Sequence, residues 1–211
     1  MASRAGVARF GDGQSTLDQR IGQQGDVIVS ELHARYYEQA VRRNVFFSHS
    51  KVRATSLGAT AQIGHILWNP PDSGVNLVLL KWASMVSVTS ATTTGFCLGF
   101  SYQSTTPTAV TVSDVSGSTF ALMSGATLTV FPQGKVKAYS IATLLNAPTD
   151  GPLLHHNTAA INATGVENMS GDFEGIIVIP PGGILTINAL GTAAAAAAHT
   201  SSLFWEEVPV I

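Results

Sequence analysis

Four acidic residues in the last quarter of the sequence are the first candidates for chemistry. Asp172 and Glu174 are two positions apart, so on a β-strand both carboxylates would lie on one side, and Glu206-Glu207 follow further along. A pair of carboxylates is what glycoside hydrolysis requires. Carboxylates on strands also face solvent or pair with arginines, and we favour that structural interpretation for these residues.

Two adjacent histidines, His155 and His156, are the next candidates, as metal ligands. Adjacent residues on a strand point to opposite faces, although a loop could bring both to one ion. No further histidine lies at a spacing that would complete such a site, and the nearest acids are Asp150 and Glu167. We therefore interpret the two histidines as surface residues of a loop and expect no metal site.

Cys97 is the only cysteine, so the chain cannot form an intrachain disulfide. Its two apolar neighbours indicate a small core residue rather than a nucleophile. The sequence contains no Gly-x-Ser-x-Gly elbow, no Walker loop for phosphate and no dinucleotide fingerprint. We expect no catalytic residue and no cofactor, and hence a protein that is not an enzyme.

Basic and aromatic residues near the N-terminus suggest contacts with a partner. Residues 1–53 contain eight Lys/Arg and five Asp/Glu, a balance of +3, whereas residues 54–211 contain three and eight, a balance of −5. Residues 1–25 are rich in Gly, Gln and Ser, which predicts an arm that orders only against a partner. Residues 30–43 predict one short helix, with Ser30 as N-cap and two Glu–Arg pairs at i,i+4 spacing. The residues that we expect to contact a partner are Arg35, Tyr36, Tyr37, Arg42, Arg43, Phe46 and Trp205.

From Val45 onward, short apolar runs separated by proline and glycine clusters predict β-strands. The strongest turn signals are Asn69-Pro-Pro-Asp-Ser-Gly74 and Pro180-Pro-Gly-Gly183. The longest strand is expected at 75–88, and because it is apolar on both faces we expect both faces to be covered. A polar stretch at 145–171 is predicted to be a surface loop.

The number and spacing of these strands favour a mainly β fold over one with alternating helices and strands. We predict an antiparallel, jelly-roll-like β-sandwich over residues 54–211. An extended N-terminal arm and the short helix would occupy residues 1–53.

Composition places further limits on the function. The 211 residues are 45% hydrophobic and only 11% charged, against about 25% charged in an ordinary soluble domain. A chain with so few charges is expected to cover part of its surface with neighbouring subunits. The net charge of −2 argues against nucleic-acid binding, and no apolar run has the length of a membrane helix. Without a secretory signal at its start, the chain is expected to be made in a cytosol.

Three segments together resemble a known group of proteins. They are Leu32-His-Ala-Arg-Tyr-Tyr-Glu38 with Arg43-Asn-Val-Phe46, then Asn69-Pro-Pro-Asp-Ser-Gly-Val-Asn-Leu-Val-Leu-Leu-Lys81, and Phe204-Trp-Glu-Glu-Val-Pro209. The combination resembles small tailed-bacteriophage proteins that are encoded among virion structural genes. The resemblance spans most of the chain, and because its motifs are structural it indicates a virion component without specifying a location.

The resemblance implies a non-enzymatic bacteriophage virion protein that is made in the cytoplasm of the bacterial host. Its expected role is that of a capsid decoration (cement) protein that trimerises and stabilises the particle, with the major capsid protein or neighbouring virion proteins as partners. One alternative is a tail or head-fibre protein that binds a receptor carbohydrate through the 145–171 loop. A third interpretation is an enzyme that cleaves cell-wall glycan with Asp172 and Glu174.

Overall fold

The computed structural model describes residues 8–9, 16–17, 44–50, 58–87, 95–111, 117–118, 134–156, 166–190 and 198–210. The chain divides into two units, Met1–Tyr37 and Glu38–Ile211. In the first unit, β1 (Ala8–Arg9) pairs antiparallel with β2 (Thr16–Leu17). The predicted helix at 30–43 lies outside the described residues.

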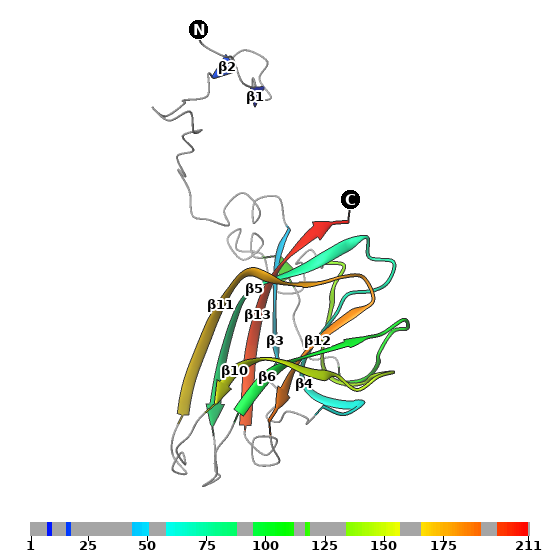
Figure 1. The fold of residues 1–211 in the computed structure, drawn as a ribbon, viewed down its shortest axis with the longest axis vertical. Helices are drawn as coiled ribbons and strands as arrows, with labels where there is room; N and C mark the ends of the chain where they lie inside the picture. Colours follow the sequence, from blue (N-terminus) through cyan, green and yellow to red (C-terminus); the bar gives the residue numbers. More distant parts are fainter. Residues whose placement is uncertain are drawn as a thin grey trace. The chain divides into compact units, whose positions relative to one another are not determined.

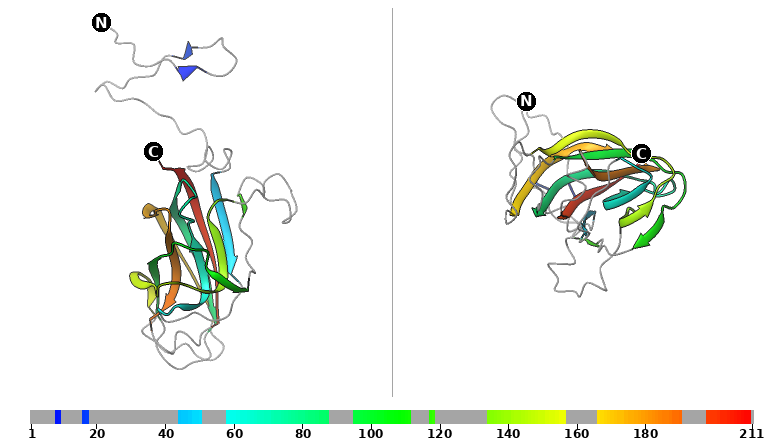
Figure 2. Two further views of the ribbon diagram at one scale, coloured as in Figure 1. Left: turned by 90° about the vertical axis from the view of Figure 1, so that its right-hand side faces the viewer. Right: turned by 90° about the horizontal axis from the view of Figure 1, so that it is seen from below.

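The second unit consists of two antiparallel sheets that face each other (Figures 1 and 2). In spatial order, the five-stranded sheet contains β11 (Val166–Ile179), β5 (Val75–Ser87), β13 (Ala198–Pro209), β3 (Val45–Ser50) and β8 (Gly117–Ser118). The six-stranded sheet contains β10 (Thr149–His156), β6 (Gly95–Tyr102), β12 (Gly183–Ala189), β4 (Ala61–Trp68), β9 (Lys137–Thr143) and β7 (Thr108–Thr111). The predicted mainly β sandwich is confirmed, whereas the jelly-roll connectivity stays a prediction.

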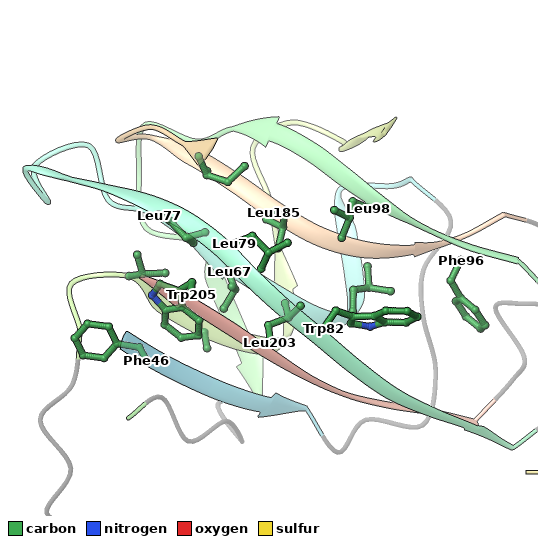
Figure 3. Packing of buried hydrophobic residues seen from close by; sticks show 14 of the residues in the cluster. Phe46, Leu67, Leu77, Leu79, Trp82, Phe96, Leu98, Leu185, Leu203 and Trp205 are labelled. Carbon is green, nitrogen blue, oxygen red and sulfur yellow. The ribbon is translucent and has the colours of Figure 1, made fainter. Parts of the chain in front are cut away.

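The main core fills the space between the two sheets. Leu98 and Leu185 of the six-stranded sheet point toward side chains of the five-stranded sheet such as Trp82, which is 2% exposed (Figure 3). Strand β13 shows how the sequence produces this arrangement, because its residues alternate between buried and half-buried positions from residue 199 to residue 208. Since successive side chains of a strand point to opposite faces, one face of β13 enters the core and the other lies on the outside of the sheet.

A second, smaller core lies on the other face of the six-stranded sheet. On β12 all seven residues are buried, and Ile184 packs there with side chains from neighbouring strands rather than with the main core. Strand β12 is therefore covered on both faces by other parts of this chain. Its partners in the small core are Ile66, Trp68, Tyr139, Ala142 and Leu144.

The expectation that both faces of the 75–88 strand are covered does not hold within the described residues. On the outer face of β5, Val78 is only partly buried and Met85 is 45% exposed. The alternation changes at Leu80 because a bulge shifts the pairing with β13, so that Leu79 and Leu80 are both buried. Such a bulge makes both faces of a strand look apolar in the sequence although one of them is open.

Two predicted boundaries also need correction. The sandwich does not begin at residue 54, because β3 pairs with β13 from Val45 onward and is an integral strand of the five-stranded sheet. The segment 145–171 is not one loop, since it contains β10 and the first part of β11. Pro152 argued against a strand in this segment, because proline cannot donate a backbone hydrogen bond. Strand β10 is an edge strand, however, and a strand that is paired on just one side can accommodate a proline.

The two proline-rich corners predicted from the sequence are both turns, and Asn69 joins them. Its side-chain Nδ2 donates to the carbonyl oxygens of Val75 and Ile179 at 2.7 and 3.0 Å. Its backbone N–H donates to Gly183 at 2.9 Å, and its carbonyl accepts from Gly182 at 2.7 Å. Asn69 is fully buried, so these four hydrogen bonds fix one end of both sheets without help from water.

Gly182 must be glycine in this arrangement. Its φ of 84° lies in the left-handed region, and a Cβ at this position would meet the ring of Tyr102. The geometry of the turn therefore explains the Pro-Pro-Gly-Gly sequence, which is the structural role that the sequence indicated.

Candidate interaction surfaces

Glu207 has a structural role. Its side chain is buried, and its two carboxylate oxygens accept hydrogen bonds from the backbone N–H groups of Lys135 and Val136, both at 3.0 Å. These bonds hold the turn that precedes β9 against β13. A carboxylate that satisfies two backbone donors stabilises the fold, and it is not free to act on a substrate.

Replacing Glu207 with alanine is expected to lower the free energy of unfolding by about 2–4 kcal/mol, because it leaves one buried and one partly buried N–H group without acceptors. The measurement is the urea midpoint of the full chain. Glu206→Ala is the matched control, because this neighbouring carboxylate lies on the opposite face of β13, where partial burial raises its pKa. We expect the control to change stability by less than about 1 kcal/mol. Equal losses in the two variants would contradict the role of Glu207.

Asp172 and Glu174 lie in an irregular segment of β11. The pairing with β5 is interrupted between Asp172 and Ile177, and Glu174 has a positive φ of 49°. The Glu174 N–H donates to Asp172 Oδ1 at 3.2 Å, so the aspartate stabilises this local turn. Both carboxylates are exposed. Their arrangement supports the structural interpretation over the catalytic one.

The remaining candidates for chemistry are Cys97 and the pair His155 and His156. Cys97 is buried, and desolvation, followed by the nearby Asp150, raises its pKa to about 11, which keeps the thiol protonated near neutral pH. His155 and His156 lie on β10, although their side chains are outside the described ones. Among the described residues, no three His, Cys, Asp or Glu side chains group closely enough to hold a metal ion.

Of the predicted partner-binding residues, the structure describes Phe46 and Trp205. Phe46 and Trp205 belong to the main core, where their rings stack with centroids 6.1 Å apart, so the fold itself explains their burial (Figure 3). This corrects the expectation that they contact a partner. Arg35, Tyr36, Tyr37, Arg42 and Arg43 lie outside the described residues.

A feature that the sequence did not indicate is a polar layer inside the sandwich. His65 of the six-stranded sheet is fully buried and hydrogen-bonds to two serines of the five-stranded sheet, Ser48 at 2.6 Å and Ser201 at 2.9 Å. His199 bonds to Ser84 at 2.7 Å, within the five-stranded sheet. A bulge at Gly64, whose φ is 124°, turns His65 into the space between the sheets.

Both of these imidazoles are held in the neutral form. Burial, together with the nearby His199 and His49, lowers the pKa of His65 to about 3. Burial alone lowers the pKa of His199 to about 4. No carboxylate is among the groups that act on either ring. Ser–His pairs without an acid and without access to solvent hold strands together, between the sheets at His65 and within one sheet at His199, rather than activating a nucleophile.

The first open surface is an apolar groove, which we call the corner groove. It has a volume of about 520 Å³ and lies between the end of β6 and the second half of β11, beside the Pro180 corner. Tyr102, Ile176 and Val178 line it and are 58%, 83% and 50% exposed. Exposed hydrophobic side chains that lie this close together are typical of protein–protein contact surfaces and of ligand-binding grooves.

The second open surface is the outer face of the five-stranded sheet, which we call the sheet face. Here Phe47 of β3 and Phe204 of β13 lie side by side, with ring centroids 6.3 Å apart. Next to this pair is a hollow of about 370 Å³, lined mainly by residues of β5, β11 and β13. The hollow is lined by hydroxyl and amide groups, by His49 and by methionine side chains, and no Asp, Glu, Lys or Arg is among its described lining residues.

Comparison with known proteins gives no match: no protein-family model, no curated protein and no solved structure corresponds to this chain. The resemblance to phage proteins therefore rests on the three sequence segments given above. Within the described residues, no helix has both the length and the hydrophobicity that crossing a membrane requires.

Proposed function

We propose that the chain is a non-enzymatic structural protein of a bacteriophage particle, a decoration or cement protein that associates into trimers and binds the major capsid protein or its neighbours. It would be made in the cytoplasm of the bacterial host and incorporated into the virion. The observation that carries this proposal is the corner groove, because it exposes three large hydrophobic side chains in a chain that has few charges.

Physical reasoning connects the groove to assembly. With only 11% charged residues, the chain has few surface charges to repel neighbouring molecules and keep an isolated molecule in solution. Burying side chains such as Ile176 and Val178 in a contact between chains removes apolar surface from water at about 25 cal/mol per Å². The side chains sit on strands and beside a proline corner, so they are already ordered and little conformational entropy would be lost on association.

The decisive substitution is Ile176→Glu in the corner groove. If copies of the chain meet through this groove, a buried and unpaired carboxylate would weaken the assembly by about 30-fold or more in dissociation constant. Light scattering of the purified full chain measures the effect: the parent protein is expected at about three times 22.0 kDa and the variant at a lower mass.

Leu190→Glu is the matched control. Leu190 is 42% exposed and follows the far end of β12, whereas the groove lies at its beginning. The control is expected to keep the mass of the parent protein. A parent protein that is a monomer at all concentrations, or an Ile176→Glu variant that retains the assembly, would refute self-association through the groove.

A further inference from the structure

From the hollow on the sheet face, we infer a second binding activity: the hollow takes a neutral saccharide of about two sugar units. This activity is independent of the assembly proposed above, since the hollow and the corner groove share no lining residue. The inference rests on the register of four strands, which places matched polar side chains in two parallel rows.

The first row crosses the sheet from β11 to β3. Ser170 lies opposite Ala83, Ala83 lies opposite Ser202, and Ser202 lies opposite His49. With neighbouring strands about 4.8 Å apart, this row is roughly 14 Å long, enough for a disaccharide. The small side chain of Ala83 is the floor of the hollow, and the hydroxyl groups and the imidazole stand around it.

The second row lies two residues further along the strands. It consists of Asn168, Met85 and Thr200, again in direct register. Asn168 is exposed and, within the described residues, its amide makes no hydrogen bond. Met85 is 45% exposed and offers an apolar surface between two polar neighbours. A row of this kind alternates hydrogen-bonding groups with an apolar contact, as the hydroxyl groups and C–H faces of a sugar ring do.

Several polar groups are held in position before a ligand arrives. His49 Nδ1 and Ser202 Oγ share a hydrogen bond of 2.9 Å, which orients the ring and leaves its other nitrogen for a ligand. Phe47 precedes His49 by two residues, and Phe204 follows Ser202 by two residues. Because every second side chain of a strand points to the same face, both phenylalanines lie on the face of the hollow and border it. Side chains fixed on strands bind with less loss of entropy than side chains on loops.

The chemistry of the lining selects a neutral saccharide over other ligands. A phosphate or carboxylate ligand calls for Arg or Lys, and neither occurs among the lining residues that the structure describes. A peptide strand needs free backbone groups, and in this part of the sheet the edge strand β11 offers them, whereas β5 and β13 are paired on both sides. A peptide paired with β11 would extend the sheet sideways and would not lie over the hollow. The lining instead offers uncharged hydroxyl, amide and imidazole groups beside an apolar side chain. Such groups form hydrogen bonds with the hydroxyl and acetamido groups of a sugar.

The test is a titration of the full chain with four disaccharides: maltose, cellobiose, lactose and N,N′-diacetylchitobiose. Isothermal calorimetry and ligand-observed NMR up to about 10 mM cover the affinity expected of an open site. We expect at least one disaccharide to bind. Asn168→Ala, which removes one amide from the second row, is expected to weaken that binding about tenfold.

Ala83→Trp is the blocking variant, because an indole on the floor fills the hollow, and it is expected to abolish binding. Asn76→Trp is its control, since residue 76 lies on the same strand and the same outer face but does not line the hollow. The control is expected to bind as the parent does. Failure of all four disaccharides to bind, or unchanged binding by Ala83→Trp, would overturn the inference. The mass measured by light scattering reports separately on assembly, so the two proposals can fail independently.

Discussion

Acidification from about pH 7 to about pH 5 is expected to lower the free energy of unfolding by about 4 kcal/mol, through the two buried histidines alone. The pKa of His65 is lowered to about 3 and that of His199 to about 4 in the folded chain, against 6.5 when unfolded. Above pH 6.5 both states are neutral and the full stability is present. Below it, only the unfolded state takes up protons, so stability is lost as the pH falls toward the folded-state values.

Chemical denaturation at a series of pH values measures this loss, and it should be read above pH 5, where most carboxylates are still ionised. A loss of this size is a large fraction of the 5–15 kcal/mol that stabilises a typical domain. His199→Gln removes one titrating ring while keeping a group that can bond to Ser84. This variant is expected to lose about 2 kcal/mol over the same range. Identical pH dependence in the parent and the variant would show that His199 is not held neutral by burial.

Asn69→Asp is expected to destabilise the fold by about 3–5 kcal/mol at neutral pH, although it replaces only the side-chain NH₂ group with an oxygen. The amide nitrogen of Asn69 donates to two carbonyl oxygens, and a carboxylate oxygen in its place would repel both. The side chain is fully buried, so water cannot relieve that repulsion. The urea midpoint measures the effect.

Asp72→Asn is the control for this substitution, since it makes the reverse exchange in the same turn. Asp72 is exposed, and we expect a change of less than about 0.5 kcal/mol. If Asn69→Asp were as stable as the parent, Asn69 would not be the residue that joins the two proline corners.

Much of the sandwich could be predicted because its strands follow local rules. The apolar run at 75–88 is β5, the run at 184–190 is β12, and both proline clusters are turns. Strand β10 was missed because its sequence, Thr149-Asp-Gly-Pro-Leu-Leu-His-His156, contains residues that normally end a strand. Only its position at the edge of the sheet, which depends on distant pairing with β6, makes that sequence acceptable.

The candidate surfaces were harder to predict, because they depend on register between strands that are far apart in the sequence. Ile176 and Val178 belong to an apolar run that resembles a core strand, and only the fold shows that they face a groove. The row of Ser170, Ala83 and Ser202 combines residues from three strands. Trp205 was assigned to a partner because tryptophan is common in interfaces, but a core position satisfies the same preference.

Incorporation into virus particles is the most direct test of the proposed function. The proposal implies that a phage encodes this chain, and quantitative mass spectrometry of purified particles of that phage would measure the ratio of the chain to the major capsid protein. We predict that the chain is present in many copies per particle and in a constant ratio between preparations. Absence of the chain from particles that are otherwise complete would contradict its role as a structural protein of the virion.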